Sequence, residues 1–238
     1  MERTPAAVRS GRSQESSIVE IAAFGGAGSA AMAAMVIRRI AARGGGVRFV
    51  GFLNDVERPG TMISGDPVLG PFAAWPSLPV ATRFIAPLQK AKEMQTRAAL
   101  VRGLGIPEQR WATVIDPDAV LAEDALYGHG TFIAPLATVL PAARIGAHVS
   151  IRNGAVVGHD VVIGDFCFVG VNAVVFGRAR VGEGAHIAPG ALIREERRVG
   201  CYSVVGVGAV VVRDVPDYAV VAGNPARVIG RIEPVVAR

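Results

Sequence analysis

A histidine followed directly by an aspartate stands in the segment Val157-Gly158-His159-Asp160. A carboxylate close enough to accept a hydrogen bond from the imidazole would fix its tautomer and raise its basicity, so the pair could serve as a general base. Gly177 follows His159 by eighteen residues. Its backbone N–H could donate to a developing oxyanion if the fold brought the two positions together. Acyl transfer needs such a set: a base, a carboxylate that orients it and a backbone N–H donor, all close together.

The element that must position these residues is a repeat with a period of six, which spans residues 115–211 without a break. Every sixth residue is aliphatic except Tyr127, and a mostly small residue follows four places later. A fixed short period is typical of a solenoid, whereas neither an amphipathic helix nor an alternating strand has this period. We predict a parallel β-helix of triangular section that winds left-handed, an exception to the usual crossover rule. Its seventeen hexads would form between five and six coils, and one coil of eighteen residues stacks Gly177 on His159.

One position breaks the repeat. Arg197 falls where a small residue is expected at a corner of the coil. Because a buried, unpaired charge is costly, the sequence predicts either a corner that opens outward or an acidic partner for Arg197, such as Glu195 or Glu196.

The residues before the repeat predict a nucleotide-binding α/β unit. A strand leads into the turn Gly25-Gly26-Ala27-Gly28, which opens a helix and is followed by a second strand ending at Asn54 and Asp55. Glycines let the backbone approach phosphates, and the helix start presents free N–H groups to them. Asn54 and Asp55 could reach a ribose or base. Alternatively, the glycines serve only close packing of helix on strand. The expected strands are 17–24, 47–53 and 80–85, and the expected helices are 29–43 and 90–104.

Composition and charge narrow the function. A formal charge of +5 suits ordinary solubility or attraction of polyanionic small ligands such as coenzyme A, and the sequence has no basic tract with interleaved aromatics that would indicate nucleic-acid binding. The isolated Cys167 and Cys201 favour a reducing, cytoplasmic setting, and we expect no membrane span. The spacings of His148 and His186 from His159 place the imidazoles on different parts of the coil, so we expect no metal.

The segment VVGHDVVIGDF at 156–166, the unbroken hexads and AGNPAR at 222–227 resemble the hexapeptide-repeat acyltransferases. More narrowly, they are similar to the sugar acyltransferases that include sialic-acid O-acetylation proteins and N-acetyltransferases of nucleotide-linked 4-amino-sugars. This resemblance implies a small Rossmann-like domain that holds the nucleotide of the sugar, and a homotrimer of left-handed β-helices with acetyl-coenzyme A between neighbouring chains.

The resemblance also implies roles for single residues. His159 would be the general base, Asp160 its partner, and the Gly177 amide the contact of the thioester oxygen. Phe168 and Arg152 depart from the family pattern, in which a histidine and an asparagine are common. The implied coenzyme contacts are Pro189, Gly206, Val207, Gly208, Pro225 and Arg227, and the implied sugar-nucleotide contacts are Gly25, Gly26, Ala27, Gly28, Asn54 and Asp55.

We therefore expect a flexible tail at 1–17, a Rossmann-like nucleotide-sugar-binding domain at 18–110 and a left-handed β-helix acyltransferase domain at 111–238. The expected activity is acetyl transfer from acetyl-coenzyme A to an amino or hydroxyl group of a sugar, which we expect to be nucleotide-linked, in surface-polysaccharide or glycan biosynthesis. Two alternatives stay open: O-acetylation of a free sugar acid or another small acceptor, and a non-catalytic scaffolding trimer.

Overall fold

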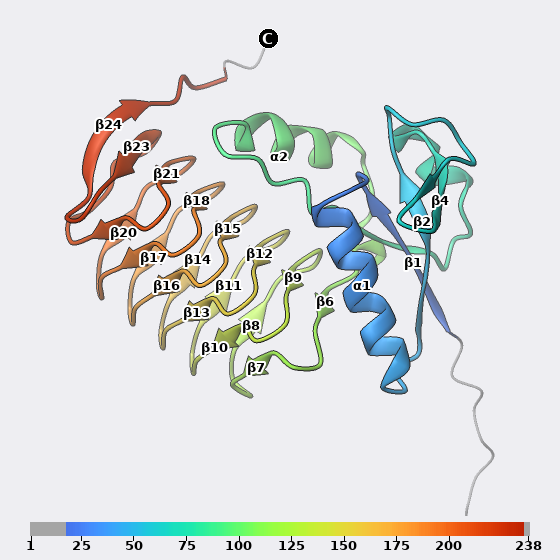
Figure 1. Cartoon of the computed structure of the whole chain (residues 1–238), viewed down its shortest axis with the longest axis horizontal. Coiled ribbons are helices and arrows are strands. Elements are labelled where there is room, and N and C mark those ends of the chain that lie inside the picture. Colours follow the sequence, from blue (N-terminus) through green and yellow to red (C-terminus); the bar gives the residue numbers. More distant parts are fainter. Residues whose placement is uncertain (1–17, 236–238) are drawn as a thin grey trace, which may run out of the picture.

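The computed structural model describes residues 18–235, and its first part is a five-stranded sheet with strand order β3-β4-β2-β1-β5. Strands β1, β2, β4 and β5 are parallel, and β3 pairs with β4 antiparallel. Helix α1 follows β1 through the glycine turn and lies between this sheet and the first coils of the second part (Figure 1). The bounds are β1 Val19–Phe24, α1 Ser29–Ala42, β2 Val47–Leu53, β3 Met62–Ile63, β4 Asp66–Gly70, β5 Arg83–Ile85 and α2 Met94–Gly103. Short 3₁₀ turns span Phe72–Ser77 and Glu108–Arg110.

The expected elements of this part exist but differ at their ends. The third strand is only Arg83–Ile85, because a turn in which the Thr82 N–H bonds to the Pro79 carbonyl precedes it. The second helix starts at Met94 rather than at residue 90, since Lys92 has a φ of 66°, outside the helical range. The hairpin of β3 and β4 was not predicted. The expected flexible tail at residues 1–17 lies outside the described residues.

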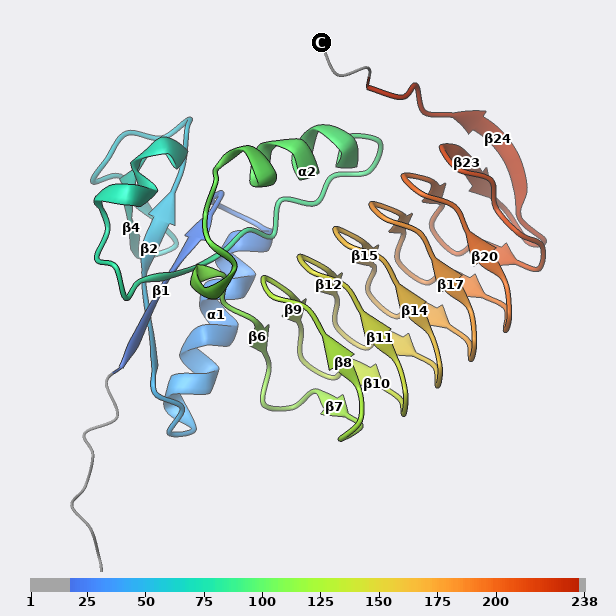
Figure 2. The same ribbon diagram turned by 180° about the vertical axis from the view of Figure 1, so that it is seen from behind.

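The second part is the predicted β-helix of three parallel sheets, and its left-handed hexapeptide-repeat architecture preceded by a small α/β unit is confirmed (Figure 2). Each rung is a two-residue strand paired with the strand eighteen residues later, as Ile145 pairs with Ile163. The strands are β6 Val114–Ile115, β7 Val120–Leu121, β8 Leu126–Tyr127, β9 Phe132–Ile133, β10 Thr138–Val139, β11 Arg144–Ile145, β12 Ser150–Ile151, β13 Val156–Val157, β14 Val162–Ile163, β15 Phe168–Val169, β16 Val174–Val175, β17 Arg180–Val181, β18 His186–Ile187, β19 Leu192–Ile193, β20 Arg198–Val199, β21 Val204–Val205 and β22 Val210–Val211. A hairpin of β23 Ala219–Ala222 and β24 Arg227–Arg231 follows the last coil.

The periodic aliphatic residues form the core of the coils. Val157, Val169 and Val175 are fully buried, and Cys167 fills a corner, where its thiol donates to the Gly182 carbonyl. Burial of such side chains is the main stabilising contribution in a narrow solenoid. Tyr127, which breaks the aliphatic pattern, is exposed in the first coil.

Arg197 finds an acidic partner, but not one of the two expected. Its Nη1 lies 3.6 Å from Asp214 Oδ1, and its Nε donates to the Glu195 carbonyl at 3.4 Å. The Glu195 and Glu196 carboxylates pair instead with Arg194 and Arg178. The prediction of those two partners was wrong because other arginines hold their carboxylates, whereas Asp214 approaches Arg197 from the next coil.

The two parts share packed surfaces. Phe132 and Ala134 of the first coils belong to one apolar cluster with Ala33 and Ile37 of α1. At the end of α1, Arg39 pairs with the buried Asp116 carboxylate at 2.6 Å. Helix α2 contacts another edge of the β-helix, where Arg102 pairs with Glu183 at 2.8 Å. The α/β unit is therefore fixed against the outer face of the sheet that contains β6, β9 and β12.

Candidate active site

His159 and Asp160 lie together at the corner between β13 and β14. Asp160 has a φ of 57°, a left-handed conformation that Asp tolerates better than most residues, and this bend turns both side chains outward. The imidazole Nδ1 is 2.8 Å from Asp160 Oδ2, and the side chains are 49% and 57% exposed. Because the carboxylate can only accept at neutral pH, Nδ1 carries the proton and Nε2 is free to take one from a substrate.

Gly177 lies one coil further on the same edge, directly against the imidazole. A Cβ added at Gly177 would be 2.5 Å from His159 Nε2, so the ring rests on a surface that a side chain would fill. The Arg178 N–H bonds to the His159 carbonyl at 2.9 Å and ties the two corners together. Within residues 18–235 the Gly177 N–H has no acceptor, so it is free to donate to a ligand. The base and the donor therefore face one place.

The same edge continues to the C-terminal hairpin. Arg213 lies three coils beyond His159, and it lines a cavity of about 190 Å³ with Asp214, Val221 and Arg227. Arg227 is exposed, and Pro225 lies in the connection between β23 and β24 after a cis peptide bond. Two guanidinium groups at this end of the edge suit a phosphate-bearing ligand.

The other implied coenzyme contacts lie on a different edge, which joins the sheet of β18 and β21 to that of β19 and β22. The Gly208 N–H bonds to the Pro189 carbonyl at 3.0 Å, and Val207 between Gly206 and Gly208 is 76% exposed. One chain therefore does not bring these four residues together with His159.

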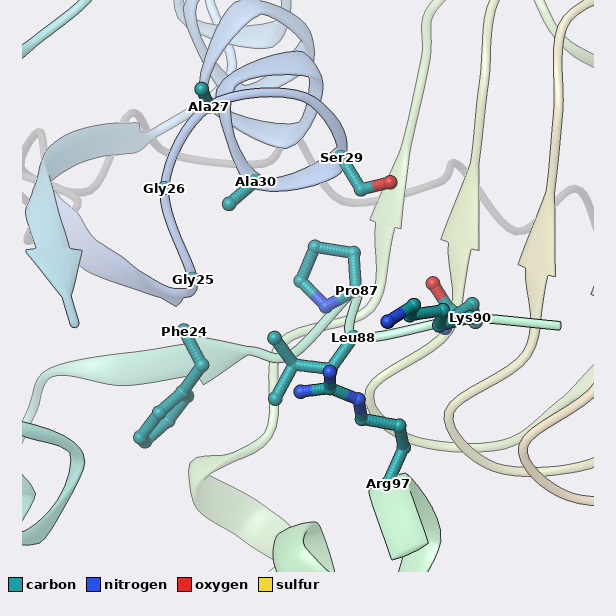
Figure 3. A pocket seen from close by; sticks show the side chains of 11 residues that line it. Phe24, Gly25, Gly26, Ala27, Ser29, Ala30, Pro87, Leu88, Lys90 and Arg97 are labelled. Atoms are coloured by element: carbon teal, nitrogen blue, oxygen red, sulfur yellow. The ribbon is translucent and has the colours of Figure 1, made fainter. Parts of the chain in front are cut away.

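The glycine turn borders a cavity of about 220 Å³, which is lined by residues of the α/β unit. Figure 3 shows Gly25, Gly26 and Ala27 arching over it, with the Ser29 hydroxyl directed toward the strands of the coils. The lining contains Lys90 and Arg97 and, among the described residues, no carboxylate. The first turn of α1 carries no acidic side chain either, so the electrostatic field in the cavity favours an anion.

Asn54 and Asp55 do not line this cavity. Asn54 Nδ2 donates to the Gly25 carbonyl at 3.1 Å, its Oδ1 accepts the N–H groups of Val56 and Glu57, and Asp55 Oδ1 accepts the Phe72 N–H at 2.6 Å. Gly28 precedes α1 and lies outside the lining as well. These contacts hold the turn in shape.

The sequence interpretation missed several cavity residues. Lys90 and Arg97 were expected only as members of the helix at 90–104, and Pro87 to Gln89 were not considered. The strand that ends at Ile85 could have indicated these residues, because ligands in parallel α/β sheets bind beyond the carboxyl ends of strands.

Two further histidines are uncharged; His148 is buried and His186 is half-buried. Burial lowers the pKa of His148 to about 3 and that of His186 to about 4.

Within residues 18–235, no three His, Cys, Asp or Glu side chains gather as a metal site would require. No helix of this part of the chain combines the length and apolar character needed to cross a bilayer.

No protein-family model and no curated protein matches the chain, but solved structures resemble it over nearly its whole length. The acetyltransferase domain of PglB from Neisseria gonorrhoeae FA1090, solved with acetyl coenzyme A, is 27% identical with a TM-score of 0.77, over 89% of this chain and 99% of that one. A mutant of perosamine N-acetyltransferase from Caulobacter crescentus, solved with CoA and GDP-perosamine, is 28% identical with a TM-score of 0.78, over 90% and 98%. WeeI from Acinetobacter baumannii AYE shares the fold at 24% identity and a TM-score of 0.75, over 88% and 99%. The resemblance to hexapeptide-repeat acyltransferases of sugars is thus confirmed, and the chain has the architecture of their N-acetyltransferase branch.

Proposed function

We propose that this protein transfers the acetyl group of acetyl-coenzyme A to an amino group of a nucleotide-linked sugar. The observation that carries the proposal is the His159 imidazole, held by Asp160 at 2.8 Å with its Nε2 against Gly177. The similarity to enzymes solved with acetyl coenzyme A, and with CoA and GDP-perosamine, supports both substrates. The glycine-turn cavity, with its cationic lining, suits the nucleotide diphosphate.

The reaction needs one proton transfer from the acceptor. As the neutral amine attacks the thioester carbonyl carbon, His159 Nε2 takes the proton that the nitrogen loses, and the N–H of Gly177 donates to the carbonyl oxygen, which becomes an oxyanion. The tetrahedral intermediate then collapses, the C–S bond breaks, and the thiolate sulfur receives the proton from the imidazolium. The products are the N-acetylated sugar and free coenzyme A.

A homotrimer completes the site in this proposal. His159 and Gly177 lie on one edge of the β-helix, whereas Pro189 and the segment 206–208 lie on another. A donor that touches both sets without crossing a sheet lies between two chains, with one edge from each. The His159 imidazole is half-exposed and lines none of the cavities described above, which supports this arrangement. The free, isolated Cys167 and Cys201 support a cytoplasmic location.

Release of free thiol from acetyl-coenzyme A tests the function. The purified protein is assayed with UDP- and GDP-linked 4-amino-sugars, alongside the His159→Ala and His129→Ala variants; His129 lies on another edge and is the matched control. We expect turnover that falls about 10²- to 10⁴-fold in His159→Ala alone. Unchanged turnover in that variant would refute the mechanism.

The same assay separates the alternatives. Turnover only with hydroxyl acceptors or free sugar acids would favour O-acetylation. Failure to bind acetyl-coenzyme A or to turn over any acceptor would favour a scaffold. Sedimentation equilibrium under assay conditions measures the assembly, and an active monomer would exclude a site shared between chains.

A further inference from the structure

Arg152 is a buried cation without an anionic partner. Arg152 directly follows β12 and is 7% exposed. No carboxylate within residues 18–235 forms an ion pair with it. Its polar contact is a long one, with Nη1 3.5 Å from Ser150 Oγ. The guanidinium carbon lies 5.5 Å from the ring centroid of Phe132 and 5.8 Å from that of Phe168. Aromatic faces offset part of the desolvation cost of a cation, but they leave its hydrogen-bond donors unused.

Contacts on both sides connect Arg152 with the glycine-turn cavity. Phe132, over which the guanidinium lies, belongs to the same apolar cluster as Ala30 of α1, which lines that cavity. Gln89, a second lining residue, donates to the His148 carbonyl at 3.4 Å, two residues before Ser150. In Figure 3 the Ser29 hydroxyl points from the cavity toward the coils. Arg152 is not part of the cavity lining itself, but these contacts lead from the lining to the face of the β-helix that carries it, called the β-helix wall below.

The charges around the cavity are not equivalent. Lys90 and Arg97 share the carboxylate of Glu93, at 2.6 Å and 3.2 Å, so their charge is partly neutralised. On the β-helix side, His186 stacks on Phe168 with ring centroids 4.4 Å apart and is neutral, because burial lowers its pKa to about 4. Arg152 is thus the unpaired fixed charge of this wall among the described residues.

We propose that Arg152 recognises a carboxylate on the acceptor, so that the sugar acetylated by this protein is an acidic sugar. This inference rests on the proposed function and names its substrate class. The planar guanidinium can bind a carboxylate with two parallel hydrogen bonds, and a buried site strengthens that pair. The backbone N–H groups suited to a diphosphate belong to the glycine turn of the α/β unit. The second anionic group is therefore assigned to the sugar, which must extend toward the β-helix that carries the transfer chemistry.

Calorimetric titration of matched ligands tests the assignment. UDP-glucuronate is compared with UDP-glucose, and GDP-mannuronate with GDP-mannose, because each pair differs in one carboxylate; UDP and GDP alone report on the phosphates. Wild type, Arg152→Lys and Arg152→Met are titrated. For at least one pair we expect wild type to bind the acid about tenfold or more tightly than the neutral sugar, Arg152→Lys to keep part of this preference, and Arg152→Met to lose it. Binding of the neutral sugar and of the nucleotide should be unchanged in both variants.

The outcomes distinguish this inference from the proposed function. Equal binding of acid and neutral sugar by wild type, or an equal loss for every ligand including UDP and GDP in Arg152→Met, would overturn the carboxylate assignment and leave the nucleotide-sugar function standing. Absence of binding by all ligands would overturn both. Melting temperature supplies the structural control: because replacing an unpaired buried charge by an apolar side chain is often neutral or stabilising, Arg152→Met should melt no lower than wild type. A lower melting temperature with the acid preference intact would show that Arg152 serves packing alone.

Discussion

The substitution Gly177→Ala tests the contact between the base and the neighbouring coil. Gly177 has an ordinary backbone conformation, so the main chain accepts alanine there. The added Cβ would lie 2.5 Å from Nε2, 2.8 Å from Cε1 and 2.9 Å from Cδ2 of His159. Carbon–nitrogen and carbon–carbon contacts this short are repulsive, and the exposed imidazole is the group that can move.

The expected effect follows from that displacement. The ring must retreat by about 1 Å to restore normal contacts, and a displacement of about 1 Å in a reacting group can cost about 10²-fold in rate. The Gly177 N–H is retained, so stabilisation of the oxyanion survives and the loss should be smaller than that of His159→Ala. Because the ring moves into solvent and no buried group is lost, the free energy of unfolding should change by less than about 0.5 kcal/mol.

The assay is thiol release at saturating acetyl-coenzyme A, with thermal melting of the same samples. Gly103→Ala is the matched control, because a Cβ at the end of α2 meets nothing within 4 Å. We expect kcat to fall about 100-fold in Gly177→Ala and to stay unchanged in Gly103→Ala. Activity of Gly177→Ala within about twofold of wild type would refute the reasoning, since the imidazole could then work without its present position. A fall in both activity and melting temperature would also contradict it.

Two further predictions concern charge. Asp160→Asn should lower kcat about 10- to 100-fold with little change in KM, because an amide no longer fixes the Nδ1–H tautomer of the His159 imidazole; steady-state kinetics check this, and equal kcat values would show that Asp160 does not orient the ring. Stability should fall as the pH drops below about 6.5, because the unfolded chain then binds protons, whereas in the folded chain His148 and His186 stay neutral down to their pKa values of about 3 and 4. Each imidazole should cost about 2 kcal/mol of unfolding free energy between pH 7.5 and pH 5, measured by urea denaturation, and a His186→Phe variant should lose about half of this dependence; a flat profile would contradict their burial as neutral groups.

The period of six carries most of what could be predicted from the sequence. It predicted the coils and the contact between His159 and Gly177, because every pairing in a regular solenoid is set by one repeat length. The predicted partner of Arg197 was wrong, since Asp214 approaches it from the next coil and the positions of charged side chains on the outside of the coils are not set by the repeat. The repeat determines which side chains face inward, but it does not predict the contacts that outward-facing side chains make.

The α/β unit was less predictable. Its β1-α1-β2 core follows local signals, but the cavity depends on how the segment after β5 folds back toward the glycine turn. Asn54 occupies a position where a polar side chain often meets a ligand, yet its amide holds the turn itself. Arg152 differs from the family pattern in the sequence, but its burial between two phenylalanine rings is visible only in the folded chain.

The edge of the β-helix holds His159 and Arg213 at a fixed distance from each other. Neighbouring coils are separated by the spacing of paired strands, about 4.8 Å, so the three coils from His159 to Arg213 span about 14 Å. A donor that places its acyl group at the imidazole and its phosphates at Arg213 and Arg227 must bridge that span, which short acyl carriers cannot do. Removing one whole coil of eighteen residues between them would leave the remaining side chains facing as they do and would shorten this distance by one coil spacing, about 4.8 Å. The number of coils between His159 and Arg213, rather than any single contact, therefore determines how long an acyl carrier must be to reach both ends of the edge.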